Sequence, residues 1–359
     1  MNLVQLRASN FRLFEDLSLP LHGRLNVFYG ANAAGKTTLL EALYCLGRGK
    51  SFRASTPQEM VGARSSRWTV FARQHQAERA PTLVGLQWSP EGFDIRLNGA
   101  TGSTLDLLRA LPVQILEPGM HRVLQEGPTY RRSFLDWGVF HVEPRFLGLW
   151  RRYRRALKQR NQVLRQQGSD RDLSVWEPEL AETGEALHTF RAIHLEKLRP
   201  AAEALTDRLL DEGRWTFELQ PGWSTEDGLA AALAKGRERD RRMGLTHEGP
   251  HRAELRIKAG ARAIKGRISR GQQKLLIAAL LLAQCREILQ QTAVPPLLLI
   301  DDFPAELARE FQASLMEAVS AYPGQVFITA FEPTEALHVG LDAAMFHVER
   351  GQVRAWTHP

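Results

Sequence analysis

The sequence predicts an α/β fold in which both ends of the chain build one parallel sheet and a mainly helical region is inserted between them. Three apolar segments are the candidate parallel strands: Leu25–Tyr29, Leu297–Asp301 and Gln325–Thr329. The first of them runs into a glycine-bounded loop and then into an apolar helix, Thr37–Leu46. From about Leu105 to Arg242 the strand patterns fade, and long segments with helical spacing replace them.

Composition fits a globular protein with polyanionic partners. The 359 residues are enough for two domains, and 43% hydrophobic content supplies a core. The net charge is +7, and 39 of the 47 basic residues are arginines. Arginine suits bidentate phosphate contacts, although a genome-wide codon bias gives the same ratio. The two cysteines, Cys45 and Cys285, predict packing in a reducing compartment. Without a secretion signal or a bilayer-length apolar run, we expect a cytoplasmic protein with no membrane partner.

The predicted elements follow in chain order. In the N-terminal lobe (1–104), Val4, Leu6 and Ala8 alternate with polar residues, as in a strand. Further strands are expected at 68–72, 82–88 and 93–97, with Asn98-Gly99 as a hairpin turn.

In the inserted arm (105–242), a basic helix is expected over Phe146–Arg165 and a second over Trp176–Leu210, where Pro200 should kink or break it. Facing apolar stripes predict that the two helices pack antiparallel. The C-terminal lobe (243–359) alternates strand and helix again and ends in a strand at Ala344–Val348.

The glycine-bounded loop carries the first chemical motif. Gly30-Ala-Asn-Ala-Ala-Gly35-Lys36-Thr37 matches G-x-x-x-x-G-K-[ST], the phosphate loop of nucleotide-binding proteins. Backbone N–H groups of residues 31–36 can surround a β-phosphate, Lys36 can reach the β- and γ-phosphates, and the Thr37 hydroxyl can bind Mg²⁺. Ala33 would be strained if its φ must be positive. The alternative is a chance match, which the strand before the loop and the helix after it disfavour.

Two further segments complete a candidate ATP site. Asp301 follows four apolar residues at the end of a strand, where it can hold Mg²⁺, and Asp302 can orient the attacking water. The alternative is an acidic pair that simply ends a strand. Ser269-Arg-Gly-Gln272 precedes the apolar helix Lys274–Leu289 and can bind an anion, or it can be an ordinary N-cap. Its position before Asp301 resembles the signature helix of ABC-type ATPases, in which one subunit closes on the nucleotide of another. The resemblance implies a dimer.

The basic helix is a candidate DNA contact. It carries Arg151, Arg152, Arg154, Arg155, Lys158 and Arg160 without an acidic residue in the same helix. Such a stripe is typical of sequence-independent binding to the phosphate backbone. A solvated helix face is the alternative. The 11 histidines show no zinc-ligand spacing.

Several segments together resemble the bacterial RecF recombination mediators, which are SMC-like ABC ATPases, over essentially the whole chain. The matching segments are Asn10-Phe11-Arg12, the phosphate loop, Lys50-Ser-Phe-Arg53, Gly127-Pro128, Arg131-Arg-Ser-Phe-Leu-Asp-Trp137, Leu157-Lys-Gln-Arg-Asn161, Gly249-Pro-His-Arg252, Ser269-Arg-Gly-Gln272 and Leu299-Ile-Asp-Asp302. The resemblance implies an ATPase head with a helical arm, ATP-dependent homodimerisation and slow hydrolysis. It further implies binding to single-stranded, gapped and double-stranded DNA, and a RecR-type partner in recombinase loading, replication-fork recovery and the SOS response.

Two departures from the family pattern concern mechanism. Ala305 and Ala308 stand where the family has Ser and Asp, and Ala253 stands where it has Asp. We therefore expect binding to be retained better than hydrolysis. A catalytically silent DNA-binding scaffold is one alternative. A transporter-type ATPase subunit is the other, and the long insertion speaks against it.

The expected site residues are as follows. Lys36, Asp302 and Ser269 are the candidate catalytic residues, and Thr37 and Asp301 the candidate Mg²⁺ ligands. The candidate ATP contacts are Gly30, Ala31, Asn32, Ala33, Ala34, Gly35, Lys36, Thr37, Thr38, Arg53, Ser269, Gly271 and Gln272. Arg53 is a candidate cis arginine for the γ-phosphate, and a strand-end arginine that binds nothing is an equal alternative.

Overall fold

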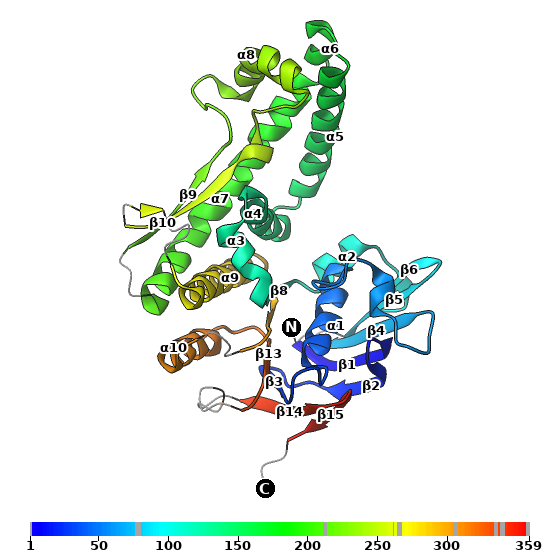
Figure 1. Ribbon diagram of the computed structural model, residues 1–359. Coiled ribbons are helices and arrows are strands. Elements are labelled where there is room, and N and C mark those ends of the chain that lie inside the picture. Colours follow the sequence, from blue (N-terminus) through cyan, green and yellow to red (C-terminus); the bar gives the residue numbers. More distant parts are fainter. Residues whose placement is uncertain are drawn as a thin grey trace. The chain divides into compact units, whose positions relative to one another are not determined.

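The computed structural model describes residues 2–75, 80–210, 214–260, 262–263, 268–303, 307–333, 337 and 342–356. The chain divides into two compact units (Figure 1). The head unit comprises Met1–Met120 and Arg270–Pro359, and the arm unit comprises His121–Ser269. Both ends of the chain therefore contribute to the head, as the sequence predicts.

A six-stranded sheet in the head joins the two ends of the chain. Its strand order is β15-β14-β3-β13-β12-β8, and every neighbouring pair except β14–β15 is parallel. The strands are β3 (Leu25–Tyr29), β8 (Val113–Leu116), β12 (Leu297–Ile300), β13 (Val326–Ala330), β14 (Ala343–Glu349) and β15 (Gln352–Ala355). The three predicted parallel strands are confirmed as the adjacent strands β3, β13 and β12. Strand β8 was not predicted, because four residues are too few to show a period.

A second, antiparallel sheet uses the N-terminal third of the chain, with the order β2-β1-β4-β5-β6-β7. Its strands are β1 (Asn2–Phe11), β2 (Phe14–Pro20), β4 (Trp68–His75), β5 (Thr82–Ser89), β6 (Gly92–Leu97) and β7 (Ala100–Thr101). A register shift between Leu3 and Gln5 buries Leu3 and turns Val4 outward, so the simple alternation expected from Val4 onward is wrong there. Asn98 and Gly99, with φ values of 52° and 82°, form the predicted turn between β6 and β7.

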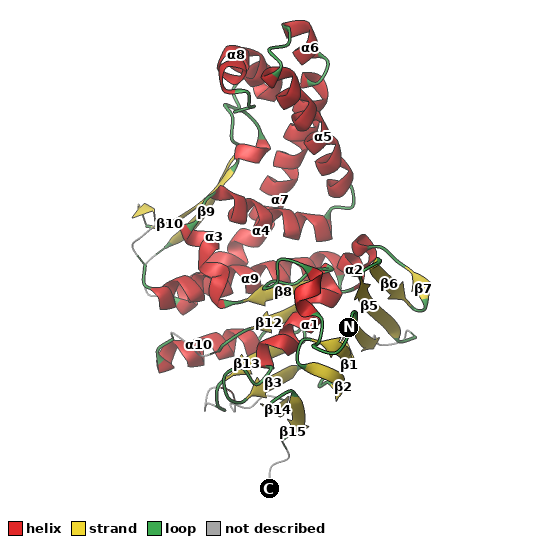
Figure 2. Ribbon diagram, turned by 45° about the vertical axis from the view of Figure 1, so that its right-hand side comes forward, coloured by secondary structure: helices red, strands yellow, loops and turns green. Residues whose placement is uncertain are grey.

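Helix α1 (Lys36–Arg48) packs against both sheets of the head. Its Leu39 and Leu43 belong to the same buried cluster as Phe28 of β3 and Val70 of β4. The other head helices are α2 (Thr104–Ala110), α9 (Arg270–Thr292) and α10 (Arg309–Ser320). In Figure 2, α9 and α10 lie together beside the parallel strands. Because α1 is enclosed by the core, the loop that precedes it has a rigid support on its C-terminal side.

Long helices dominate the arm unit. They are α4 (Pro128–Val142), α5 (Phe146–Arg165), α7 (Glu177–Leu209) and α8 (Gly228–Met243), with the short α3 (Arg122–Gln125) and α6 (Asp170–Ser174). Strands β9 (Trp215–Gln220), β10 (Glu254–Ala259) and β11 (Arg262–Ala263) form an antiparallel sheet in the order β11-β10-β9.

Helices α5 and α7 are antiparallel neighbours, as predicted. Arg145, just before α5, lies over the ring of Phe190, while Arg160 near the other end of α5 pairs with Glu177 at the start of α7. Figure 1 shows the two helices side by side. Helix α7 continues through Pro200, so the alternative of a break at this proline is wrong.

The limits of the arm unit lie downstream of both expected boundaries. The sequence places the inserted domain at 105–242, whereas the compact unit is His121–Ser269. Helix α2 and strand β8 belong to the head, and β10 pairs with β9 inside the arm unit. Among the described residues, no helix is both long enough and apolar enough to cross a bilayer.

Helix α10 follows directly after Ala308, one of the positions that depart from the family pattern. Ala308 is the N-cap residue, with φ −65° and ψ 152°, and its side chain makes no capping hydrogen bond. An N-cap aspartate would accept a hydrogen bond from an amide of the first turn. Helix α10 thus begins without the side-chain cap that the aspartate implied by the family resemblance would supply.

Ala308→Asp should restore that cap. We expect it to raise the free energy of unfolding by about 1 kcal/mol, measured by urea denaturation. Ala313→Asp is the matched control. Ala313 is exposed inside the same helix, so an aspartate there adds the same charge without capping an amide. Equal effects of the two substitutions would contradict the capping explanation.

Candidate functional site

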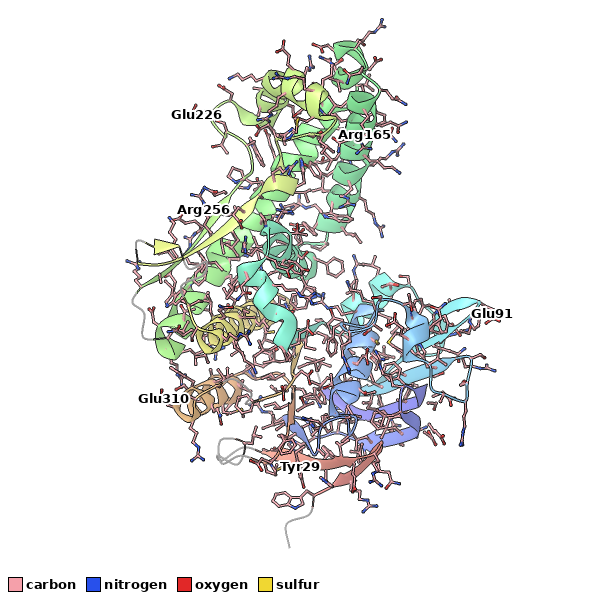
Figure 3. The ribbon with its side chains drawn as sticks, in the orientation of Figure 1. Tyr29, Glu91, Arg165, Glu226, Arg256 and Glu310 are labelled. Carbon is pink, nitrogen blue, oxygen red and sulfur yellow. The ribbon has the colours of Figure 1, made fainter. Side chains whose placement is uncertain are left out.

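The loop between β3 and α1 has the backbone geometry of a phosphate-binding loop. Tyr29, labelled in Figure 3, ends β3 directly before it. Gly30 has φ 147°, and a Cβ atom there would lie 2.2 Å from the carbonyl oxygen of Val348. Gly35 has φ 117° and precedes α1, whose first turn carries neither a side-chain cap nor an acidic residue. The start of this helix therefore suits an anion, and both glycines are required by the backbone.

Ala33 adopts the strained conformation that was considered from the sequence. Its φ is 62°, in the left-handed region that favours glycine. The side chain is exposed at the tip of the loop, so no packing compensates for the backbone strain. An alanine at this position therefore carries a conformational cost that glycine would avoid.

Lys36 lies folded back on the loop that it follows. Its Nζ donates to the carbonyl oxygens of Gly30, at 2.7 Å, and Ala31, at 2.8 Å. Burial lowers the pKa of Lys36, and the charges of Asp302 and Asp301 oppose that shift. The ammonium group thus already lies inside the concave side of the loop.

Asp301 joins the loop to the ends of the parallel strands. Its Oδ1 accepts hydrogen bonds from Thr37 Oγ1, at 3.0 Å, and from Thr329 Oγ1, at 2.7 Å. The three residues follow or end β3, β12 and β13, whose carboxyl ends meet at one edge of the sheet. Asp301 is buried, whereas the neighbouring Asp302 is exposed and has φ 58°.

Thr37 and Asp301 fit a magnesium ion. They bring a hydroxyl and a carboxylate oxygen within 3.0 Å of each other, and both are hard oxygen ligands. Among the described residues, no group of three or more His, Cys, Asp or Glu side chains could hold a metal. Any metal here would therefore take its other ligands from phosphates and water, which is how Mg²⁺ is usually bound.

An open cavity of about 480 Å³ adjoins these residues. Its lining includes most of the predicted contacts: Asn32, Ala33, Ala34, Gly35, Lys36, Thr37, Thr38, Arg53, Asp301 and Asp302. Gly30 and Ala31 contribute their carbonyl groups to Lys36 instead. The cavity also contains Arg12 and Leu13, which sequence reasoning did not assign to the site. The resemblance of Asn10-Phe11-Arg12 to the family pattern was the one available signal.

The predicted signature residues lie at the start of α9. Ser269 and Arg270 are exposed, and Gly271 and Gln272 are half-buried. Of the described head residues, Gly271 and Gln272 are not part of the cavity lining. One turn further along α9, however, Lys274 Nζ donates to the backbone carbonyl oxygen of Asp302, at 3.2 Å, so this part of the helix lies beside a residue of the cavity.

The basic stripe of α5 is only partly exposed. Arg151, Arg154, Arg155 and Lys158 face solvent, and Arg165, labelled in Figure 3, marks the end of the helix. Arg152 is also exposed, but it forms two 2.7 Å hydrogen bonds with Glu179 of α7.

Arg160 does not belong to this surface. Its side chain has no exposed area, and it pairs with Asp240 at 2.7 Å and with Glu177 at 3.1 Å. Its inclusion among the DNA-contacting residues is therefore corrected, because a fully paired, buried guanidinium cannot reach a phosphate. The sequence argument considered acidic partners only within the same helix, whereas these partners come from α7 and α8.

Comparisons with known proteins agree with this geometry. The profile of the RecF/RecN/SMC N terminal domain matches residues 2–352. The chain is 38% identical to the DNA replication and repair protein RecF of Thioalkalivibrio sulfidiphilus over 357 residues, which cover 99% of each chain. It is 40% identical to the protein of the same name from Stenotrophomonas maltophilia over 362 residues, covering 99% of this chain and 100% of the relative.

Solved structures show the same fold. A structure of the recombination mediator protein RecF-ATP in the RecFOR pathway matches with a TM-score of 0.86 and 24% identity, over 99% of this chain and 98% of that one. An Smc head bound to the C-winged helix domain of ScpA matches with a TM-score of 0.63 and 14% identity, over 99% and 98% of the two chains.

Ala33→Gly should relieve the strain in the phosphate loop. We expect the free energy of unfolding without nucleotide to rise by about 1 kcal/mol, measured by urea denaturation. Ala31→Gly serves as the control, since Ala31 is exposed in the same loop and is not among the residues with positive φ, so its replacement mainly adds chain entropy to the unfolded state. A destabilised Ala33→Gly protein would show that the left-handed backbone is not strained.

Arg160→Leu should destabilise the arm strongly. It removes the buried cation shared by Asp240 and Glu177, which then keep only their partly exposed partners Arg239 and Arg237, so we expect a loss of about 3 kcal/mol in unfolding free energy. Arg155→Leu on the exposed side of the same helix should change it by no more than about 0.5 kcal/mol. Comparable losses in chemical denaturation would refute the distinction between the two arginines.

Proposed function

The chain belongs to the RecF family, and from that premise we propose that it is an ATP-dependent DNA-binding protein of recombinational repair and replication-fork recovery. The observation that carries the proposal is the Thr37–Asp301 hydrogen bond beside the phosphate loop. It brings together a hydroxyl and a carboxylate, the pair proposed to hold Mg²⁺, at the end of a parallel sheet and next to a lysine and an uncapped helix start.

In this proposal ATP binds in the cavity around the phosphate loop. Backbone N–H groups and Lys36 hold the phosphates, while Thr37 and Asp301 hold Mg²⁺, which neutralises phosphate charge when bound. Lys36 has to leave the Gly30 and Ala31 carbonyls to reach a phosphate oxygen. The likeness in fold to a RecF-ATP structure supports the same ligand, and Arg53 is the candidate for the γ-phosphate.

Hydrolysis is proposed to be slow. Asp302 is exposed in the cavity, where its carboxylate can orient a water molecule. Its left-handed backbone is fixed by a 2.8 Å hydrogen bond from its N–H to Thr329 Oγ1. Ala308 lacks the side chain that would cap α10 just after this segment, and Ala305 lies outside the described residues. Without that cap, the segment after Asp302 is held less firmly to α10. Slow hydrolysis of this kind suits an ATPase that works as a switch.

A second chain is proposed to complete the site. Ser269, Gly271 and Gln272 lie at the start of a 23-residue helix whose N-terminal end can bind an anion. The exposure of Ser269 leaves this end accessible to another molecule. ATP held by one head and contacted by the signature residues of another would then drive homodimerisation.

DNA is the proposed polyanionic partner. Arg151, Arg154, Arg155 and Lys158 form an exposed row on α5, whereas Glu179 competes with DNA for Arg152. Such a row contacts phosphates irrespective of sequence, which suits single-stranded, gapped and double-stranded DNA. By family membership, a RecR-type mediator is the proposed protein partner in recombinase loading.

A catalytically silent DNA-binding scaffold is the second candidate. The strained Ala33 and the uncapped Ala308 are the observations that favour it, because both lie in segments that an active ATPase must position accurately. Under this alternative, nucleotide binding stabilises the head without turnover.

Lys36→Met tests the switch. The wild-type protein should sediment as a dimer with ATP and Mg²⁺ and as a monomer without them, whereas Lys36→Met should stay monomeric. Binding of Lys36→Met to DNA should persist and weaken steeply with salt, because the exposed row on α5 is intact. Lys235→Met, which removes an exposed lysine of α8, is the control and should dimerise normally.

Normal ATP-driven dimerisation of Lys36→Met would disprove the switch. ATP turnover with gapped DNA, measured against Asp302→Asn, separates the two candidates. Equal rates for the wild type and Asp302→Asn would favour the scaffold.

A further inference from the structure

Two arginines enter the nucleotide cavity from segments that are separate in the sequence. Arg12 lies between β1 and β2, and Arg53 lies in the loop that follows α1. Both line the same cavity as Lys36. Mobile arginine side chains carry considerable rotamer entropy, so an arginine that must meet a phosphate benefits from being held in place beforehand.

One buried carboxylate, Glu41, holds the first arginine. Its two oxygens accept hydrogen bonds from Arg12 Nε, at 2.6 Å, and from Arg12 Nη2, at 2.7 Å. The Glu41 side chain has no exposed area, and the hydrogen bond to Glu41 raises the pKa of Arg12. Such a fork-to-fork pair fixes the guanidinium plane as well as its position.

The same carboxylate also anchors the loop that carries the second arginine. Ser51 Oγ donates to Glu41 Oε1 at 2.5 Å and accepts from the backbone N–H groups of Arg53 and Ala54, each at 2.8 Å. The next residue, Phe52, packs edge-on against Tyr44 of α1, with ring centroids 5.3 Å apart. The backbone of Arg53 is therefore tied to α1 through Ser51, and Phe52, the residue before it, packs on the same helix.

Glu41 lies on the helix face that also presents the magnesium-binding hydroxyl. Thr37 and Glu41 are four residues apart on α1, so they are neighbours on one face, one turn apart. A single helix thus carries Lys36 and Thr37 at its start and the anchor of both arginines one turn later.

We propose that Glu41 is a positioning residue that, through Arg12 and the Ser51 hydroxyl, holds the two arginines of the cavity ready for a nucleoside triphosphate. The inference rests on the proposed nucleotide site and extends it to the selection of triphosphate over diphosphate. Arg53 contacts the terminal phosphate, and Ser51 fixes the position of the Arg53 backbone. An ion pair with a role only in folding would change stability and leave the relative affinities for the two nucleotides unchanged.

Ser51→Ala in the full-length protein is the decisive variant, because it cuts the loop from Glu41 and leaves the Glu41–Arg12 pair intact. Affinities for ADP and for a non-hydrolysable ATP analogue are measured by calorimetry in Mg²⁺. We expect affinity for the analogue to fall about ten- to a hundredfold, as for loss of a hydrogen bond to a charged group, with affinity for ADP little changed. Ser51→Thr keeps the hydroxyl and should keep the selectivity.

A double-mutant cycle with Arg53→Ala shows whether Ser51 acts through that arginine. If it does, Ser51→Ala has no further effect once Arg53 is replaced. Ser89→Ala is the control, since the Ser89 hydroxyl also donates to a carboxylate, that of Glu91, in an exposed turn outside the cavity lining, and the variant should leave both affinities unchanged. Glu41→Gln should weaken the ATP analogue more than ADP, and its thermal unfolding is recorded to confirm a folded head.

The outcomes distinguish a failure of this inference from a failure of the proposed nucleotide site. A wild-type protein that binds neither nucleotide would refute the nucleotide site itself. A wild type that binds both, with a silent Ser51→Ala or with additive effects of Ser51→Ala and Arg53→Ala, would refute only the positioning role of Glu41.

Discussion

The hydrogen bond between Thr37 and Asp301 is the interaction on which the site depends. It joins residues 264 positions apart, and it exists because β3 and β12 lie on either side of β13 in one parallel sheet. Their carboxyl ends then fall at the same edge, where the phosphate loop begins. The inserted arm leaves this arrangement unchanged, since both ends of the chain return to the head. Everything proposed about nucleotide and magnesium follows from this meeting of two distant segments.

The firm packing of α1, the helix that follows the phosphate loop, distinguishes this site from a chance arrangement of the same residues. Helix α1 is enclosed by both sheets of the head, and its buried Glu41 ties Arg12 and the Ser51 loop to the same helix. The phosphate loop itself can change conformation more easily. Its backbone is strained at Ala33, and Lys36 Nζ is hydrogen-bonded to the loop's own carbonyl groups. A firm scaffold with a loop ready to rearrange is the organisation expected of a site that responds to its ligand.

The sequence predicted the parts of the fold that depend on local pattern. Apolar runs located β3, β12 and β13, and helical spacing gave α5 from Phe146 to Arg165 with the bounds that the structure has. What it missed depends on contacts between distant segments. Strand β8 is too short to show a period, the shift at Leu3 arises from pairing with β4, and Arg160 is buried by partners on α7 and α8. Likewise, Arg12 joins the cavity only because β1 passes beside α1, although the family resemblance already marked its segment.

The most direct measurement is a crystal structure of the wild-type protein with a non-hydrolysable ATP analogue and Mn²⁺, with the metal located by its anomalous signal. The account predicts one metal bound between Thr37 Oγ1 and the Asp301 carboxylate, with Lys36 Nζ moved from the Gly30 and Ala31 carbonyls to a phosphate oxygen. A nucleotide bound elsewhere, or one bound in the cavity while Lys36 keeps both carbonyl contacts and no metal lies at Thr37, would contradict it.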